Sequence, residues 1–150
     1  PSSWRRGSDY CDGWMPGRIR TATCNKMVKY LEEQCKLAGR PMVTTGAIPI
    51  TSIDKNRDVA LSKVNVKGLI NEGNTPAKKT WVRPASGTFS TVADIEGLLM
   101  AGTPADIARD TKRYEDAGLN HIVFDLRFRY ADWYQQIDLL GQEVLPAVKA

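Results

Sequence analysis

Two groups of side chains have the chemistry to bind a ligand, and each follows a short segment with strand character. Their members are Trp14, Met15 and Arg18, at the end of DGW or just after it, and Asp125, Arg127 and Arg129, at the end of HIVFDL or just after it. A guanidinium binds a phosphate or carboxylate through paired hydrogen bonds, and an indole packs against a planar ring. These are the candidate binding residues, although Arg127 has an alternative, which is an ion pair with Asp125 or Asp132.

Other catalytic chemistries have little support. The sequence contains no GxSxG, no HExxH and no glycine-rich phosphate loop, so nothing indicates nucleophilic or metal-dependent catalysis. Its single histidine, His121, begins a predicted strand, and we expect it to be structural. Cys11, Cys24 and Cys35 show no spacing typical of zinc, so we expect reduced thiols and no metal.

The composition predicts one globular domain. Of 150 residues, 42% are hydrophobic and 25% are charged, which supports a core and argues against disorder. A net charge of +4 is compatible with nucleic acid, but charges of opposite sign alternate, as in RDTKRYED. A solvated surface explains them better. The chain lacks both an apolar run of about 18 residues and a secretory signal in PSSWRRGSDY, so we expect a soluble, cytoplasmic protein.

The elements that position the candidates alternate between strands and helices. Apolar residues recur at steps of three and four in TATCNKMVKYLEEQCKLAGR and in ADWYQQIDLLGQEVLPAVKA, where they are Trp133, Ile137, Leu140 and Val144. This spacing predicts two amphipathic helices. The segments 12–16, 42–50 and 121–126 predict strands, the last two buried.

A further helix has clear boundary signals. Thr103 is suited to cap it, Pro104 to occupy its first position, Asp106 to favour its first turn, and Gly118 to end it. The middle of the chain is less regular. We expect a weak helix at about 55–69, a long loop or insertion at 71–90, and a short helix in STVADIEGLLM.

Alternating strands and helices predict an α/β fold with parallel strands joined by right-handed crossovers. In such folds the functional residues lie at the carboxyl ends of the strands. This rule favours the residues that follow DGW and HIVFDL, and it places His121 at the opposite end.

Three stretches of the chain also match motifs of a known family. RRGSDYCDGWMPGRI is similar to a passage R-A-A-x-x-a-D-G-W-x-P, AGTPADIARDTKRYEDAGLNHIVFDL to a later aGtP passage ending in A-G-v-d-h-v-v, and LLGQEVLPAVKA to a final f-x-x-E-V-L-P-a-l. These passages belong to luciferase-like flavin-dependent oxidoreductases, which include bacterial luciferase, alkane sulfonate monooxygenase and deazaflavin-dependent dehydrogenases. The matches follow the family's order and frame almost the whole chain.

The resemblance implies the C-terminal portion of a TIM-barrel-like fold. Residues 1–150 correspond to about three β/α units, strands six to eight, and form a single partial barrel domain. A complete barrel takes about 250 residues, and open sheet edges must be covered. We therefore expect either a homo-oligomer or a missing N-terminal half of the barrel as partner.

The resemblance also implies a function. It predicts a segment of an oxidoreductase that uses reduced FMN or a deazaflavin coenzyme for monooxygenation or hydride transfer on a small organic substrate. Trp14, Arg18 and Arg127 are the expected cofactor-binding residues, and no residue is assigned a catalytic role. Trp14 could equally pack the barrel top. The loop around Trp81 and Arg83 could be a lid, but an insertion is favoured. The alternative function is a truncated, non-catalytic barrel that serves as a binding or assembly module.

Overall fold

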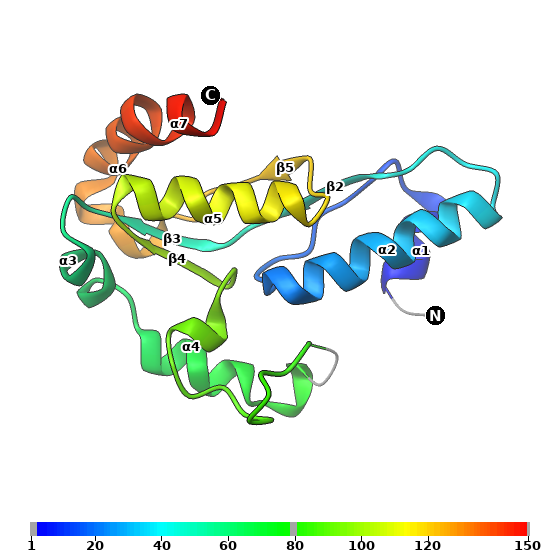
Figure 1. The fold of residues 1–150 in the computed structure, drawn as a ribbon, viewed down its shortest axis with the longest axis horizontal. Coiled ribbons are helices and arrows are strands. Elements are labelled where there is room, and N and C mark those ends of the chain that lie inside the picture. Colours follow the sequence, from blue (N-terminus) through cyan, green and yellow to red (C-terminus); the bar gives the residue numbers. More distant parts are fainter. Residues whose placement is uncertain (1–2, 79–80, 150) are drawn as a thin grey trace.

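Parallel strands form the centre of the computed structural model, which describes residues 3–78 and 81–149. In this part of the chain, β1 (Gly13–Trp14), β2 (Thr44–Ala47) and β5 (His121–Ile122) form a sheet in the order β1-β2-β5, while β3 (Ile50–Ile53) pairs with β4 (Leu99–Gly102). Every one of these pairings is parallel. The predicted α/β fold with parallel strands is therefore confirmed, and Figure 1 shows β2 and β3 following each other along one extended segment.

The backbone ladder beside β5 extends beyond the strand itself. The amide of Val123 donates to Ala47 (3.0 Å), the amide of Asp125 donates to Pro49 (3.1 Å), and the amide of Thr51 donates to the carbonyl of Asp125 (2.9 Å). The extended chain thus reaches Asp125 before it turns away. This geometry places Asp125 and Arg127 where HIVFDL ends, as the sequence predicts.

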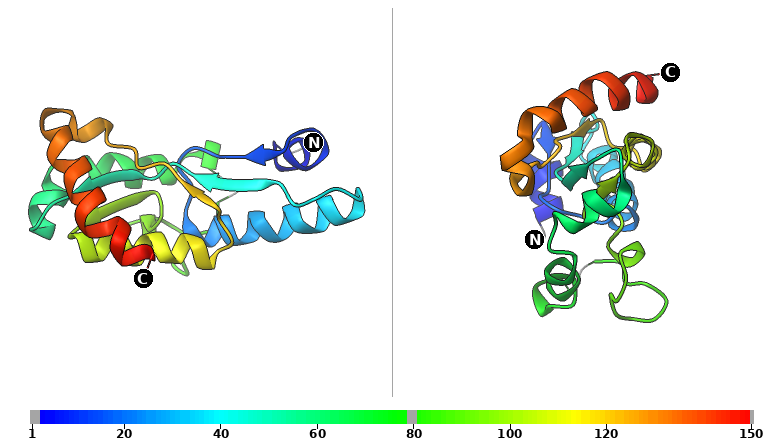
Figure 2. Two further views of the ribbon diagram at one scale, coloured as in Figure 1. Left: turned by 90° about the horizontal axis from the view of Figure 1, so that it is seen from above. Right: turned by 90° about the vertical axis from the view of Figure 1, so that its left-hand side faces the viewer.

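Helices flank the strands. They are α1 (Ser3–Tyr10), α2 (Thr21–Leu37), α5 (Pro104–Asp116), α6 (Trp133–Leu139) and α7 (Leu145–Lys149), the last two joined by a π-helical turn at Leu140–Val144. The α5 terminus has the predicted capping signals. Thr103 and Asp106 form a reciprocal capping box, and Gly118 has a φ of +87° just beyond the helix. Figure 2 shows the α6–α7 segment and the α1–α2 pair at opposite ends of the molecule.

The apolar side chains form two clusters. The main core packs α2, α5 and the π-helical turn against the strands, and it includes Cys24, Met27, Leu31, Ile107, Tyr114 and Val144. A second core lies below β3 and β4 and includes Ile50, Leu69, Trp81, Phe89, Ile95 and Leu99. Both cores support the strand ends, because β3 contributes side chains to each.

Alternation along the extended segment 121–126, which contains β5, divides its side chains between two faces of the sheet. Ile122, Phe124 and Leu126 pack against the main core. Val123, which lies between them, is 43% exposed, and so is Met15. The methyl of Met15 packs closely over Gly46, because a Cβ added to Gly46 would lie 2.7 Å from it. The face opposite the helices therefore presents apolar side chains to solvent.

The middle of the chain differs from the sequence prediction. The helix expected at 55–69 is two helices, α3 (Arg57–Ser62) and α4 (Val66–Gly73), because Asn65 caps a new helix by accepting from the amide of Gly68. In STVADIEGLLM only a 3₁₀ turn at Ala93–Ile95 is helical, and LLM runs into β4. Gly97, with a φ of +87°, separates the turn from the strand.

The segment 71–90 contains the end of α4 and a 3₁₀ turn at Pro76–Lys78, and its residues 79–80 lie outside the described chain. Side chains hold it together. Asn74 accepts from the amide of Phe89 (3.0 Å) and donates to its carbonyl (2.9 Å), and Arg83 donates to the carbonyl of Gly73 (3.0 Å). That the segment is an insertion stays a prediction.

The last helix buries a different stripe from the predicted one. Leu140 and Val144 are buried as expected, but Trp133 is 48% exposed and Ile137 is half-exposed too. The polar Gln136 takes the inward position one turn before Leu140. A hydrophobic pattern could not reveal that position, because a glutamine occupies it.

Candidate functional site

A pocket of about 330 Å³ lies at the end of the extended segment that contains β5. Its lining is mostly apolar and aromatic: Ile48, Val123, Phe124, Asp125, Leu126, Arg127, Tyr130 and Trp133. Ligand sites in α/β proteins favour this end of the strands, and they combine apolar walls with a few polar groups. This pocket is therefore the candidate functional site.

Its polar groups are the ion pair of Asp125 and Arg127. Arg127 Nε donates to Asp125 Oδ1 at 2.8 Å, and the side chain of Arg127 is 66% exposed whereas that of Asp125 is 8% exposed. The hydrogen bond to Asp125 raises the pKa of the Arg127 guanidinium. The second oxygen, Asp125 Oδ2, is buried and has no hydrogen-bond donor among the described residues. Oδ1 of this carboxylate thus accepts hydrogen bonds from Arg127, whereas Oδ2 has no hydrogen-bond partner within the described residues.

Arg129 fixes the turn that forms the pocket wall. This 3₁₀ turn spans Arg127–Asp132, and the guanidinium of Arg129 is buried beneath it. Arg129 Nη1 donates to Ser52 Oγ (2.8 Å) and to the carbonyl of Ile53 (3.1 Å), while Nε donates to Asp132 (3.0 Å). These bonds tie the turn to the end of β3. They hold the pocket-lining side chains on either side of Arg129 in place.

The aromatic wall of the pocket comes from the same turn and from the start of α6. The rings of Tyr130 and Trp133 lie 6.1 Å apart at 41°. Both rings remain accessible, Tyr130 more so than Trp133. Exposed aromatic rings beside an apolar pocket can pack against a planar ligand.

Trp14 and Arg18 lie away from this pocket. Trp14 packs edge-on against Trp4, with ring centroids 6.5 Å apart. Arg18 Nη1 donates to Glu72 Oε2 at 3.0 Å, and Lys78 pairs with the other oxygen of Glu72 at 3.3 Å. The structure thus brings Arg127 together with Asp125, and it places Trp14 beside α1 and Arg18 beside α4.

His121 lies on the exposed face of the sheet, beside Gly46 and Met15. Within the described parts of the chain, no group of three or more His, Cys, Asp or Glu side chains is placed to hold a metal ion. Across the same residues, every helix is too short or too polar to cross a bilayer.

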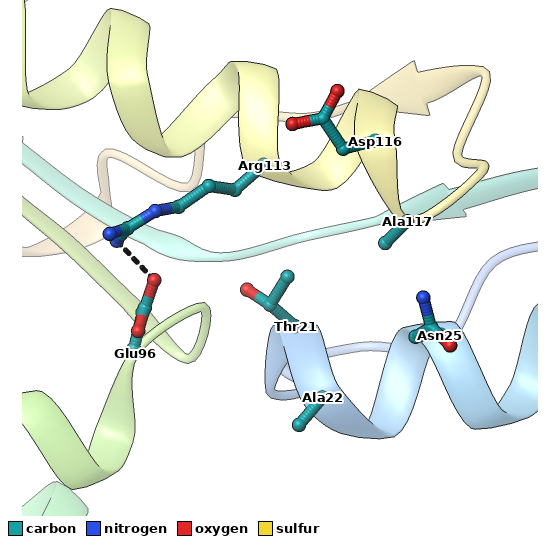
Figure 3. Close-up of a pocket in the computed structure, with 7 residues that line it drawn as sticks. All are labelled: Thr21, Ala22, Asn25, Glu96, Arg113, Asp116 and Ala117. Atoms are coloured by element: carbon teal, nitrogen blue, oxygen red, sulfur yellow. Dashed lines mark hydrogen bonds and ion pairs between the residues drawn. The ribbon is translucent and has the colours of Figure 1, made fainter.

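A second hollow, of about 560 Å³, lies between α2 and α5 and is drawn in Figure 3. Thr21 and Asn25 project from α2, and Arg113 reaches from α5 to form an ion pair with Glu96. No strand contributes to its lining, and its arginine already has an acidic partner. It is therefore a weaker candidate than the pocket beside Arg127.

Comparison with known proteins identifies similar structures. No protein-family model matches the chain, and no curated protein matches its sequence. Among solved structures, the chain is similar to a coenzyme F420-dependent tetrahydromethanopterin reductase from Methanopyrus kandleri, with a TM-score of 0.74 and 19% identity over 95% of this chain and 47% of that one.

Two further structures are similar to the chain, and one of them was solved with a second cofactor, FMN. An F420-dependent secondary alcohol dehydrogenase, solved with an F420–acetone adduct, matches with a TM-score of 0.69 and 19% identity over 97% of this chain and 45% of its own. The oxygenating constituent of 3,6-diketocamphane monooxygenase from Pseudomonas putida, solved with FMN, matches with a TM-score of 0.63 and 12% identity over the same shares.

The chain thus spans less than half the length of these structures. They are F420- and FMN-dependent enzymes of the kind that the sequence motifs resemble, and the parallel α/β arrangement corresponds to part of their fold. The resemblance to luciferase-like flavin and deazaflavin enzymes is confirmed at the level of the fold.

Proposed function

We propose that this chain forms part of an oxidoreductase barrel that binds reduced FMN or a deazaflavin coenzyme at the carboxyl ends of its strands. The observation that carries the proposal is the apolar pocket at the end of the β5 segment, bordered by Trp133 and by the exposed guanidinium of Arg127. The activity is monooxygenation or hydride transfer on a small organic substrate.

The residues present fit one side of such a cofactor. Tyr130 and Trp133 offer accessible ring faces for a planar tricyclic ring. Of the guanidinium nitrogens of Arg127, Nε bonds to Asp125 within the described residues, so the two terminal nitrogens can donate to a ring carbonyl or a phosphate. When bound, the flavin or deazaflavin supplies the hydride or the reactive oxygen chemistry. The chain's own residues orient the ring and shield the pocket from water.

The three expected cofactor contacts have unequal support. Arg127 lies at the pocket and is our preferred contact. Trp14 and Arg18 are engaged with Trp4 and Glu72, so each contacts a cofactor only if the cofactor extends across β1. We therefore propose Arg127, and with it Trp133, as the cofactor contacts to test first.

Titration with FMN and with 8-hydroxy-5-deazaflavin tests the proposal. We expect quenching of the ligand's fluorescence on binding, with affinity about tenfold lower in Arg127→Met because a charge-assisted hydrogen bond is lost. Arg109→Met is the matched control, because Arg109 pairs with Asp106 on the surface of α5. Unchanged fluorescence of both ligands at saturating protein would rule out the cofactor site in this chain.

We further propose that the exposed sheet face is covered by additional β/α units. Met15 and Val123 are each 43% exposed on this face, and the similar solved structures contain more than the same length of chain again. The units come either from a second copy or from an N-terminal half of the barrel. Native mass spectrometry beside the denatured mass distinguishes these sources, and a folded monomer of 150 residues alone would contradict both.

A non-catalytic role is the second candidate. The chain covers only 45–47% of the first two similar structures, and a partial barrel could persist as a binding or assembly module. In that case the protein associates through the exposed face but leaves the flavin fluorescence unchanged.

A further inference from the structure

The carboxylate of Asp125 is attached to backbone that the sheet ladder fixes. The amide of Asp125 donates to the carbonyl of Pro49 (3.1 Å), and its carbonyl accepts from the amide of Thr51 (2.9 Å). Its side chain is only 8% exposed. Asp125 therefore offers a well-placed acceptor to its neighbours but little surface to a ligand.

The side chain of Arg127 is long and 66% exposed, and it bonds to Asp125 through Nε, which lies 2.8 Å from Oδ1. A guanidinium is planar and its N–H bonds point in fixed directions. A hydrogen bond from Nε therefore restricts the orientation of the whole group. Without that bond, the side chain would lose more rotamer freedom when a ligand binds.

We propose that Asp125 is a positioning residue, which holds the guanidinium of Arg127 so that its terminal nitrogens are ordered before a ligand binds. The inference rests on the proposed function, because it takes Arg127 as a cofactor contact. It adds a role for Asp125 that acts only through Arg127.

Two other effects of Asp125 must be separated from positioning. Oδ1 also accepts from the backbone amide of Arg127 at 3.3 Å, a bond that favours the turn itself. The negative charge also opposes the binding of an anionic ligand nearby. Asp125→Asn removes the charge but keeps an oxygen that accepts both bonds, whereas Asp125→Ala removes charge and acceptor. The difference between these two variants therefore measures the hydrogen bonds at equal charge.

A double-mutant cycle then isolates the bond to the guanidinium. Titration with FMN and with 8-hydroxy-5-deazaflavin gives the affinity from fluorescence quenching. We expect Asp125→Ala to bind about fivefold more weakly than Asp125→Asn, and the two variants to bind equally when each is combined with Arg127→Met. The same difference in both backgrounds would assign Asp125 to the turn alone and overturn the inference. Equal affinity of Asp125→Ala and Asp125→Asn in the presence of Arg127 would also overturn it.

Asp9→Ala is the matched control. Asp9 likewise accepts from an arginine Nε, that of Arg5 at 3.4 Å, but the pair lies on α1. Its loss should leave the affinity for both ligands unchanged.

Relaxation of the ¹⁵Nε–H signal of Arg127 tests the positioning without any ligand, and Arg127→Met assigns the signal. We expect the order parameter of a rigid group, about 0.85, in the wild type and in Asp125→Asn, and a value below about 0.6 in Asp125→Ala. A mobile guanidinium in the wild type would overturn the inference. A rigid guanidinium that loosens in Asp125→Ala, without flavin binding, would reject the proposed function and still support Asp125 as the group that orders Arg127.

Discussion

The side-chain amide of Gln136 pairs with the backbone of Ile53 as a neighbouring strand would. Gln136 Oε1 accepts from the amide of Ile53 and Nε2 donates to its carbonyl, both at 2.8 Å. The β5 segment has already turned away after Asp125, so no strand within residues 3–78 and 81–149 pairs with Ile53 on that side. A helix residue thus completes the end of the sheet directly beneath the pocket-forming turn.

Replacing this buried glutamine with leucine should lower the free energy of unfolding, although leucine is the more apolar side chain. In Gln136→Leu the amide of Ile53 loses its partner in a buried setting, which we expect to cost about 2–3 kcal/mol. Urea unfolding measures the change. Gln135→Leu is the control, since Gln135 is exposed on the same helix, and its unfolding free energy should change by less than about 0.5 kcal/mol. Equal effects in the two variants would contradict the pairing role.

Arg129 provides a second test of how the pocket wall is held. Arg129→Met removes the donors that reach Ser52 and Ile53, and it leaves Asp132 without its buried partner. Because the Asp132 side chain is 30% exposed, most of the loss comes from the buried hydroxyl and carbonyl that lose a donor, and we expect it to be about 2 kcal/mol.

The matched control is Arg113→Met, because the guanidinium of Arg113 is 45% exposed and its partner Glu96 is 38% exposed. Exposed pairs contribute about 1 kcal/mol or less. A similar loss of unfolding free energy in both variants would show that Arg129 does not anchor the turn.

Local signals in the sequence correctly predict the ends of an element when those ends depend on neighbouring residues. Thr103, Asp106 and Gly118 set the ends of α5, because capping involves atoms within a few residues. The position of Arg127 at the end of an extended segment was likewise predictable. Of the two ion pairs considered for it, the one with Asp125 is present, whereas Asp132 pairs with Arg129.

Sequence patterns do not predict contacts between residues that are far apart along the chain. Gln136 and Arg129 are buried polar residues whose partners lie in β3, far away along the chain, so no hydrophobic period marks them as inward. The apolar run LLM was expected to be helical but joins β4. A short apolar run does not distinguish a strand from a helix, and here pairing with β3 decides between them.

Gly97 should tolerate no side chain. Its φ is +87°, and a Cβ would lie 2.5 Å from the backbone nitrogen of Thr21 and 2.9 Å from the hydroxyl of Tyr114. Gly97→Ala therefore combines backbone strain with overpacking, and we expect a loss of about 3 kcal/mol.

Gly141→Ala is the opposite case within the same fold. Nothing lies within 4 Å of the position of its Cβ, and it sits in the π-helical turn between α6 and α7. Alanine there should stabilise the chain by about 0.5–1 kcal/mol. Thermal unfolding of both variants measures the two changes in stability. A Gly97→Ala variant as stable as the wild type would contradict the close packing around Gly97.

The carboxylates of α5 predict how stability depends on pH. Partial burial raises the pKa of Asp106, but the backbone amide of Thr103 and the guanidinium of Arg109 outweigh it and lower the pKa to about 2. Since the unfolded value is about 3.9, ionised Asp106 stabilises the folded chain above pH 4. This stabilisation is lost as the pH falls through 2. Asp106→Asn should therefore show a smaller fall in unfolding free energy between pH 5 and pH 2 than the wild type.

Asp110, one turn further along α5, should act with the opposite sign. Burial raises the pKa of its carboxyl despite the nearby Arg109 and Arg113, so the folded chain holds this proton more tightly than the unfolded chain does. Its stabilising contribution is present below the unfolded pKa and is lost as the pH rises through the folded one. Asp110→Asn should consequently gain more unfolding free energy than the wild type between pH 3 and pH 6, whereas Asp106→Asn gains less. Urea titrations of the three proteins across this range measure both signs, and parallel curves would contradict the two pKa shifts.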